Sequence, residues 1–220
     1  NHTCTLQANA KAGFSIMTLA NYTSASGVTI GHGLDKAPSM YFHKSRSSSG
    51  NWHVYHKSLG ATKAMILNST SSVATAIGYW ANTEPTADVL SLGNTFAGTS
   101  DGLVYAWAEV DGYSKFGSYT GNGNANGAFI YTGFRPKMIF LRRTGGTDDW
   151  FVMDTTRDTH NVAGDYLTWN TTNTESDSSL VDFLSNGFKL RSSSASLNPS
   201  GSTIIYGAWG DVPFKYNNTF

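Results

Sequence analysis

The sequence predicts an all-β protein made of two tandem β-sandwich repeats, jelly-roll-like or concanavalin-like, that pack together. Three observations predict this fold class. The 220 residues include 23 Gly and 13% aromatic residues but only 14% charged residues, a composition typical of strands joined by turns. Short β-rich runs alternate with turn clusters along the whole chain. The second half of the chain also repeats the pattern of the first half.

The repeat is visible as matching segments that keep their order along the chain. The matching pairs are Pro38 and Pro136, 98 residues apart, Trp52 and Trp150, also 98 residues apart, and Trp107 and Trp209, 102 residues apart. Small insertions in loops would produce this drift in spacing. We therefore predict two domains, over residues 13–113 and 114–220, preceded by a polar leader or linker over residues 1–12.

Each domain is predicted to consist of short strands. In the first domain they are 14–19, 28–30, 40–44, 52–56, 64–67, 77–80, 89–92 and 103–110. In the second they are 129–132, 138–142, 150–153, 166–169, 181–184, 188–191 and 203–209. Polar and glycine-rich turn clusters separate them, and helical signals are weak.

Four tryptophans are predicted to lie in the structural core. Trp52 and Val54 stand two residues apart, as do their counterparts Trp150 and Val152, so each pair shares one face of a strand. We expect that face to be the buried one. Trp107 and Trp209 end the last strand of each domain and complete the predicted core set.

Charge and cysteine content exclude several classes of protein. Lys plus Arg and Asp plus Glu each number 15, so the chain has no basic excess for a nucleic-acid partner. No apolar run reaches the length of a membrane span, so we expect no membrane insertion. Cys4 is the single cysteine, which rules out an internal disulfide and a four-thiolate zinc site.

No pattern in the sequence predicts catalysis, so we expect a protein that is not an enzyme and has no catalytic residues. The chain contains no Gly-x-Ser-x-Gly elbow, and most acidic residues fall in turns, where carboxylates cap backbone amides. Gly121–Gly127 is too long for a dinucleotide fingerprint and precedes no helix, which favours a hairpin.

We expect no cofactor and no metal, but two weaker metal hypotheses stay open. His43 and His53, with a distant third ligand, would make a zinc site, whereas His53 and His56 point to opposite faces of a strand. Asp148, Asp149 and Asp154 with nearby carbonyls would suit calcium, although the dense spacing of a calcium loop is missing.

Aromatic side chains near loops make a glycan a candidate ligand. β-Sandwiches bind sugars by stacking exposed aromatic rings on pyranose faces while polar side chains bond the hydroxyl groups. The glycan-stacking candidates are Tyr22, Trp80, Tyr119 and Trp169. The opposing interpretation is that these rings belong to the core or to an interface.

Several motifs together resemble a known family. They are Gly13–Ile16, Gly31–Leu34, Trp52–Gly60, Ala108–Gly123 and Asn186–Arg191. The set resembles β-rich domains of unknown function that occur in large structural proteins of tailed phages, especially marine phages and cyanophages. The resemblance covers nearly the whole chain after Asn9.

The resemblance implies a virion component: a tail fibre, an appendage or a surface decoration that acts in assembly or host-surface attachment. It implies partners among other virion subunits, a homo-oligomer, a host-surface glycan, and a virion or extracellular location. In such proteins the domain lies within a longer chain, in keeping with the absence of an initiating Met. The alternatives are a free carbohydrate-binding module or lectin and, less favoured, a glycan-degrading hydrolase.

Overall fold

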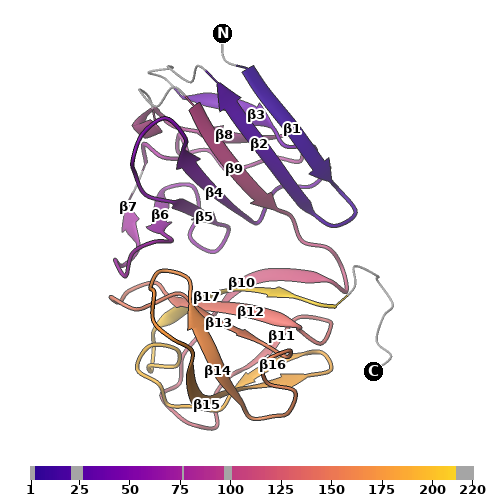
Figure 1. Ribbon diagram of the computed structural model, residues 1–220, viewed down its shortest axis with the longest axis vertical. Coiled ribbons are helices and arrows are strands. Elements are labelled where there is room, and N and C mark those ends of the chain that lie inside the picture. Colours follow the sequence, from indigo (N-terminus) through magenta and orange to yellow (C-terminus); the bar gives the residue numbers. More distant parts are fainter. Residues whose placement is uncertain (1–2, 21–26, 76, 97–100, 212–220) are drawn as a thin grey trace. The chain divides into compact units, whose positions relative to one another are not determined.

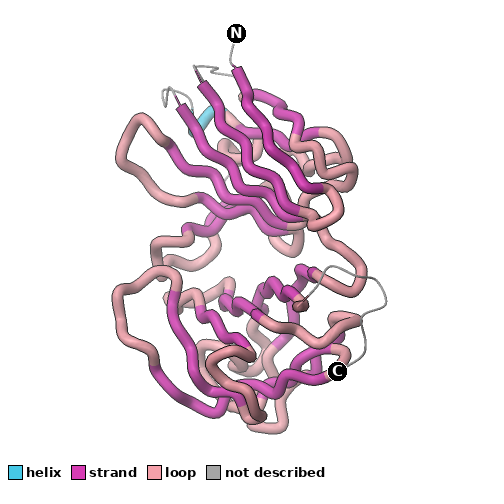
Figure 2. Tube along the Cα trace, turned by 45° about the vertical axis from the view of Figure 1, so that its right-hand side comes forward, coloured by secondary structure: helices cyan, strands magenta, loops and turns pink. Residues whose placement is uncertain are grey.

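The computed structural model describes residues 3–20, 27–75, 77–96 and 101–211 (Figure 1). Within these residues the protein consists of antiparallel β-sheets and one 3₁₀ turn, Asn94–Phe96 (Figure 2). The predicted all-β class is confirmed. The chain divides into two compact units: unit 1 comprises residues 1–67 and 73–109, and unit 2 comprises residues 68–72 and 110–220.

Unit 1 contains a seven-stranded sheet and a separate two-stranded sheet. The large sheet has the order β1-β2-β9-β4-β5-β6-β7, and β3 pairs with β8. The strands are β1 (Thr3–Asn9), β2 (Phe14–Ala20), β3 (Val28–Gly31), β4 (Met40–Ser45), β5 (His53–His56), β6 (Lys63–Ile66), β7 (Ala74–Thr75), β8 (Val89–Leu92) and β9 (Asp101–Trp107).

The core of unit 1 lies between these two sheets. Buried residues of the large sheet, such as Met17 and Val104, belong to the same apolar cluster as Ile30 and Leu90 of the small sheet. Trp80 is fully buried in this cluster, where its ring meets the Tyr41 ring at 4.9 Å and its indole N–H donates to the Lys63 carbonyl at 2.9 Å. The unit is therefore a two-layer sandwich of unequal sheets.

Unit 2 is built on one eight-stranded sheet with the order β10-β17-β12-β13-β14-β15-β16-β11. The strands are β10 (Ser114–Thr120), β11 (Phe129–Tyr131), β12 (Met138–Arg143), β13 (Phe151–Asp154), β14 (Ala163–Thr168), β15 (Ser176–Leu184), β16 (Gly187–Leu190) and β17 (Thr203–Trp209). The sheet curls over its own core, because the ring of Phe188 in β16 lies 5.5 Å from that of Tyr206 in β17, although four strands separate β16 from β17.

Strand pairing is equivalent in the two units. β4 lies between β5 and β9 in unit 1, and β12 lies between β13 and β17 in unit 2. Phe42 is paired with Tyr105, and Phe140, 98 residues after Phe42, is paired with Gly207, 102 residues after Tyr105. These are the spacings of the sequence repeat. The β3–β8 pair and the β11–β16 pair also correspond.

The N-terminal region differs from the prediction of a leader over residues 1–12. Thr3–Asn9 form β1, which pairs along its whole length with β2. The alternation in this segment, with Cys4, Leu6 and Ala8 on one face and threonines, Gln7 and Asn9 on the other, is a strand pattern that its polarity concealed. The units also change at Glu109–Val110, four residues before the predicted boundary.

The predicted core tryptophans need a correction. Only Trp150 is fully buried; Trp52, Trp107 and Trp209 are partly exposed. All four belong to the sheet faces opposite the two apolar clusters, whereas Tyr55 enters the cluster of unit 1 from the same strand as Val54. Both faces of these strands carry apolar residues. The alternation along the sequence therefore shows which residues share a face, but it does not show which face packs against the core.

Candidate functional site

An open groove runs along the hairpin of β1 and β2 in unit 1. Its volume is about 620 Å³, and it is lined by Gln7, Ala8, Asn9, Ala10, Lys11, Phe14 and Ile16. Gln7 lies opposite Ile16 and Asn9 opposite Phe14 in the register of the two strands. These four side chains therefore share the sheet face that points away from the core cluster.

The chemistry of the groove combines amides, one ammonium group and one aromatic ring. Gln7 and Lys11 are exposed, Phe14 is half-buried, and Ile16 is 36% exposed. The Oδ1 atom of the Asn9 side chain already accepts a hydrogen bond from the Ala12 backbone amide at 3.1 Å, which fixes the turn of the hairpin. Phe14 supplies an aromatic ring, Gln7 and Asn9 supply amide groups, and Lys11 supplies an ammonium group. This combination suits a polar ligand with apolar faces, such as a sugar.

Aromatic rings continue from the groove across the same sheet face. Phe14 lies 5.1 Å from Trp107 and 6.2 Å from Tyr105, and Tyr105 stacks on Trp52 at 6.0 Å with an interplanar angle of 8°. Phe42 meets Trp107 edge-on at 4.9 Å. Trp107 and Tyr105 contact the Phe14 ring directly, and Phe42 and Trp52 pack against those two rings, so a row of aromatic side chains supports the groove.

Of the four predicted glycan-stacking residues, the three that the structure describes differ in their exposure to solvent. Trp80 is 0% exposed and Tyr119 is 9% exposed, with its hydroxyl donating to the Leu197 carbonyl at 2.8 Å, so neither ring offers a face to a sugar. Both are core residues, so the opposing interpretation, that these rings belong to the core, is correct for Trp80 and Tyr119. Trp169 is 38% exposed beside Phe140 at 5.3 Å. Tyr22 lies outside the described residues.

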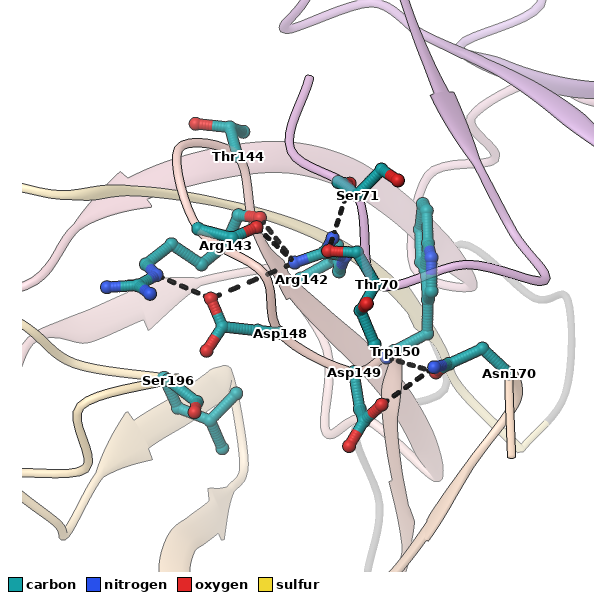
Figure 3. A network of polar contacts seen from close by, with 12 residues as sticks. Thr70, Ser71, Arg142, Arg143, Thr144, Asp148, Asp149, Trp150, Asn170 and Ser196 are labelled. Carbon is teal, nitrogen blue, oxygen red and sulfur yellow. Dashed lines mark hydrogen bonds and ion pairs between the residues drawn. The ribbon is translucent and has the colours of Figure 1, made fainter. Parts of the chain in front are cut away.

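A buried arginine organises a second cluster of polar groups, in unit 2 (Figure 3). Arg142 is 0% exposed and donates to the carbonyl oxygens of Thr70 and Ser71, both at 2.7 Å. It also donates to the carbonyls of Arg143 at 2.8 Å and Gly146 at 3.3 Å. Burial lowers the pKa of this guanidinium from its usual value. Its charge-assisted hydrogen bonds thus join two carbonyls of segment 68–72 to one carbonyl at the end of β12 and one in the loop that follows. We infer that Arg142 holds segment 68–72 against this end of β12.

The aspartates of the calcium hypothesis are engaged in other contacts. Asp148 accepts from Arg143 Nε at 2.6 Å, and Asp149 accepts from the Asn170 amide at 2.7 Å (Figure 3). Asp154 caps the Arg157 amide at 2.9 Å and pairs with the Arg157 guanidinium at 2.6 Å. Each carboxylate thus stabilises a turn or a neighbouring cation, and the three do not converge on one point.

The histidines of the zinc hypothesis lie side by side in the core of unit 1. His43 and His53 are cross-strand partners with ring centroids 6.5 Å apart, and the His43 ring packs on Phe96 at 3.8 Å. Burial lowers the pKa of His43 to about 3 and that of His53 to about 4. Over the described ranges, no group of three or more His, Cys, Asp or Glu residues is placed to hold a metal ion.

The Gly121–Gly127 segment is a loop held by one buried side chain. Asn198 is 0% exposed; its side-chain Oδ1 accepts from the Asn122 backbone amide at 2.9 Å, and its side-chain Nδ2 donates to the Asn124 and Ser192 carbonyls, both at 2.8 Å. A Cβ at Gly121 would lie 2.3 Å from the Pro199 oxygen, so this position requires glycine. The segment joins β10 to β11, which pair with β17 and β16 and not with each other, so the hairpin interpretation is wrong and the segment is a loop between non-adjacent strands.

No helix in the described part of the chain is long and apolar enough to cross a membrane.

Comparison with known families places the chain in a group defined by sequence. A family model described as a domain of unknown function, DUF7483, matches residues 1–213. The chain belongs to the DUF7483 family. The predicted relation to a family of unknown function that covers nearly the whole chain is confirmed, and the family's description mentions neither a virion nor a fibre.

Two further comparisons gave no match. No curated protein matched this DUF7483 chain, and no solved structure did.

The sequence did not reveal the groove, because five of its residues, 7–11, fall in the predicted leader, while Phe14 and Ile16 fall in the predicted strand 14–19. The alternation of Thr3–Asn9, followed by Gly13 with a φ of 64° between two strand-like runs, is the signal of a hairpin.

Proposed function

We propose that this DUF7483 chain is a non-enzymatic structural module of a virion, as a tail fibre, appendage or surface decoration, and that it serves assembly and attachment to the host surface. The resemblance to phage structural domains motivates the virion. The observation that carries the non-enzymatic role is the use of reactive side chains for structure: His43 and His53 are enclosed by aromatic rings, and Asp148, Asp149 and Asp154 each cap or pair with a neighbour.

We also propose that the two units are copies of one jelly-roll-like or concanavalin-like domain. The equivalent pairing of β2, β9, β4 and β5 with β10, β17, β12 and β13 supports this duplication. Antiparallel sheets with hydrogen-bonded interior strands give the rigidity that a repeated subunit of a virion needs, while loops and edges remain available for contacts.

The test of the virion role is to locate the chain in infected cultures. Antibodies against the chain are used for immunogold electron microscopy of purified particles from the same source, and mass spectrometry measures the chain in particles and in cell lysate. The proposal expects labelled particles and co-purification with other virion proteins. A chain found in the cytosol of uninfected cells and never in particles would refute it.

A second candidate function is carbohydrate binding, and the β1–β2 groove favours it. Phe14 offers a ring supported by Trp107 for stacking, and Gln7 and Lys11 offer donors for hydroxyl groups. A host-surface glycan would then be the attachment ligand. This function is compatible with a virion module or with a free lectin.

A glycan array followed by titration calorimetry tests the groove. Gln7→Ala and Lys11→Ala are chosen first because both side chains are exposed and their loss leaves the core intact. We expect each to weaken glycan binding about tenfold, the loss of one or two hydrogen bonds. Trp169→Ala serves as the matched control on unit 2. If Trp169→Ala abolishes glycan binding while both groove variants still bind, the glycan site lies at Trp169 and not in the groove.

A further inference from the structure

We propose that the free edge of β1 pairs with β1 of a second copy of this chain, so that the large sheets of two copies continue into one another. Among the strands of the described residues, β1 is the first in its sheet and has β2 as its one neighbour. All seven of its residues, Thr3–Asn9, are exposed. Its outward backbone amides and carbonyls form a row that another strand can pair with.

The other strands at the ends of the large sheets are protected against such pairing. β7 is two residues long and β11 is three residues long. β10 carries Lys115 and Gly117, both of which weaken an edge as a pairing template. β1 has neither a charged residue, a proline nor a glycine, and its pairing with β2 is regular from Thr3 to Asn9.

The exposed side chains of β1 point to a second β1 as the partner. Cys4, Leu6 and Ala8 share the face of the core residues Met17 and Leu19, yet Leu6 is 42% exposed. In an antiparallel pair centred on Leu6, Leu6 meets Leu6, Cys4 meets Ala8 and Thr5 meets Gln7. Apolar side chains then meet apolar ones and polar side chains meet polar ones, and no like charges oppose one another.

A second copy of β1 fits the geometry of a symmetric dimer. Two copies related by a two-fold axis use the same surface, which closes the contact at a dimer. The ladder of seven residues spans roughly 24 Å at the usual rise per residue. The pairing requires no change in either copy, because β1 is already extended and held by β2. The inference does not depend on the virion role or on glycan binding.

Charge placed at the polar face of β1 tests the pairing. The double variant Thr5→Lys/Gln7→Lys puts lysine opposite lysine at two positions of the proposed register, and Thr5→Glu/Gln7→Glu does the same with glutamate. Sedimentation velocity in reducing buffer measures the dissociation constant of the dimer. We expect the wild type to dimerise with a constant below roughly 1 mM and each variant alone to bind itself at least about tenfold more weakly.

Mixing the two variants distinguishes repulsion from misfolding. Lysine then meets glutamate, so the mixture is expected to form a heterodimer at least as readily as the wild type. Ser176→Lys/Ser178→Lys adds the same charge at exposed positions of the interior strand β15 and should dimerise like the wild type. A wild type that stays monomeric at about 1 mM, or lysine and glutamate variants that dimerise unchanged, would overturn the proposal.

Discussion

His43 and His53 face each other across β4 and β5 inside unit 1, and neither nitrogen of the His43 ring has a hydrogen-bond partner within the described residues. The surrounding rings are those of Phe96 and Tyr79, and the positive charge of Lys44 acts on both histidines and lowers the pKa of each further. The pair therefore stays neutral in the folded protein. In unit 2 the positions 98 residues later are occupied by Leu141 and Phe151, which are apolar.

The first prediction is that stability falls as the pH drops below about 6.5. The usual pKa of histidine is 6.5, whereas the folded values are about 3 for His43 and about 4 for His53. The unfolded chain thus binds more protons below pH 6.5, and the free energy of unfolding decreases from there towards pH 3. Above pH 6.5 the contribution of the two neutral histidines to the free energy of unfolding is fully present. Urea unfolding between pH 4 and pH 8 measures it.

The control for this prediction comes from the repeat itself. His43→Leu combined with His53→Phe introduces the residues of unit 2 and should flatten the pH dependence of unit 1. An equally steep loss of stability in the double variant would show that other groups cause it.

The second prediction concerns Arg142. Arg142→Ala removes the donor to the carbonyls of Thr70, Ser71 and Gly146 and empties the space of a fully buried side chain, so we expect the free energy of unfolding of unit 2 to fall by about 2–4 kcal/mol. Arg135→Ala, an exposed arginine of the same unit, is the control and should change stability by less than about 0.5 kcal/mol. Equal effects of the two substitutions in denaturant unfolding would contradict the role assigned to Arg142.

The third prediction compares repeat-equivalent tryptophans. Trp150 is fully buried, with Phe140 at 5.7 Å and the Arg142 guanidinium carbon 5.8 Å from its ring centroid. Trp150→Ala should lower stability by about 3–5 kcal/mol. Trp52 is half-buried, so Trp52→Ala should cost clearly less. Thermal and urea unfolding check the order, and a larger loss at Trp52 would contradict the difference in burial between the two rings.

The fourth prediction concerns the loop around Asn198. Asn198→Ala removes three hydrogen bonds to loop backbone groups, so we expect a loss of about 2–4 kcal/mol and faster amide exchange at residues 122–126. Asn198→Asp keeps the acceptor for the Asn122 amide and should be intermediate. Unchanged exchange in the alanine variant would mean that the loop holds its shape without this side chain.

Much of the fold was predictable from the sequence because its strands carry strong local signals. The runs after Pro38 and Pro136 and the closing Trp107 and Trp209 mark β4, β12, β9 and β17, with strand bounds near those expected. The strands that were missed have weak signals. Thr3–Asn9 is polar on one face, Ala74–Thr75 is only two residues long, and Ser114–Thr120 carries a single aromatic residue on each face.

The candidate site was less predictable because exposure depends on tertiary packing. Trp80 ends the predicted strand 77–80 next to a loop, which favoured a surface ring, yet Tyr41 and Tyr55 from distant strands contact it in the core. Phe14 begins a strand and gave no sign of lining a groove, because the groove exists only once β1 lies beside β2. Burial of a single aromatic residue is set by long-range contacts that no local pattern records.

The claim that one β-module occurs twice is tested most directly by main-chain nuclear Overhauser effects across strands. Cross-strand contacts are measured between Phe42 and Tyr105 in unit 1 and between Phe140 and Gly207 in unit 2. The account predicts both contacts, in antiparallel pairing with the same register relative to Trp107 and Trp209. A unit 2 register shifted by one residue, or contacts seen in one unit alone, would contradict it.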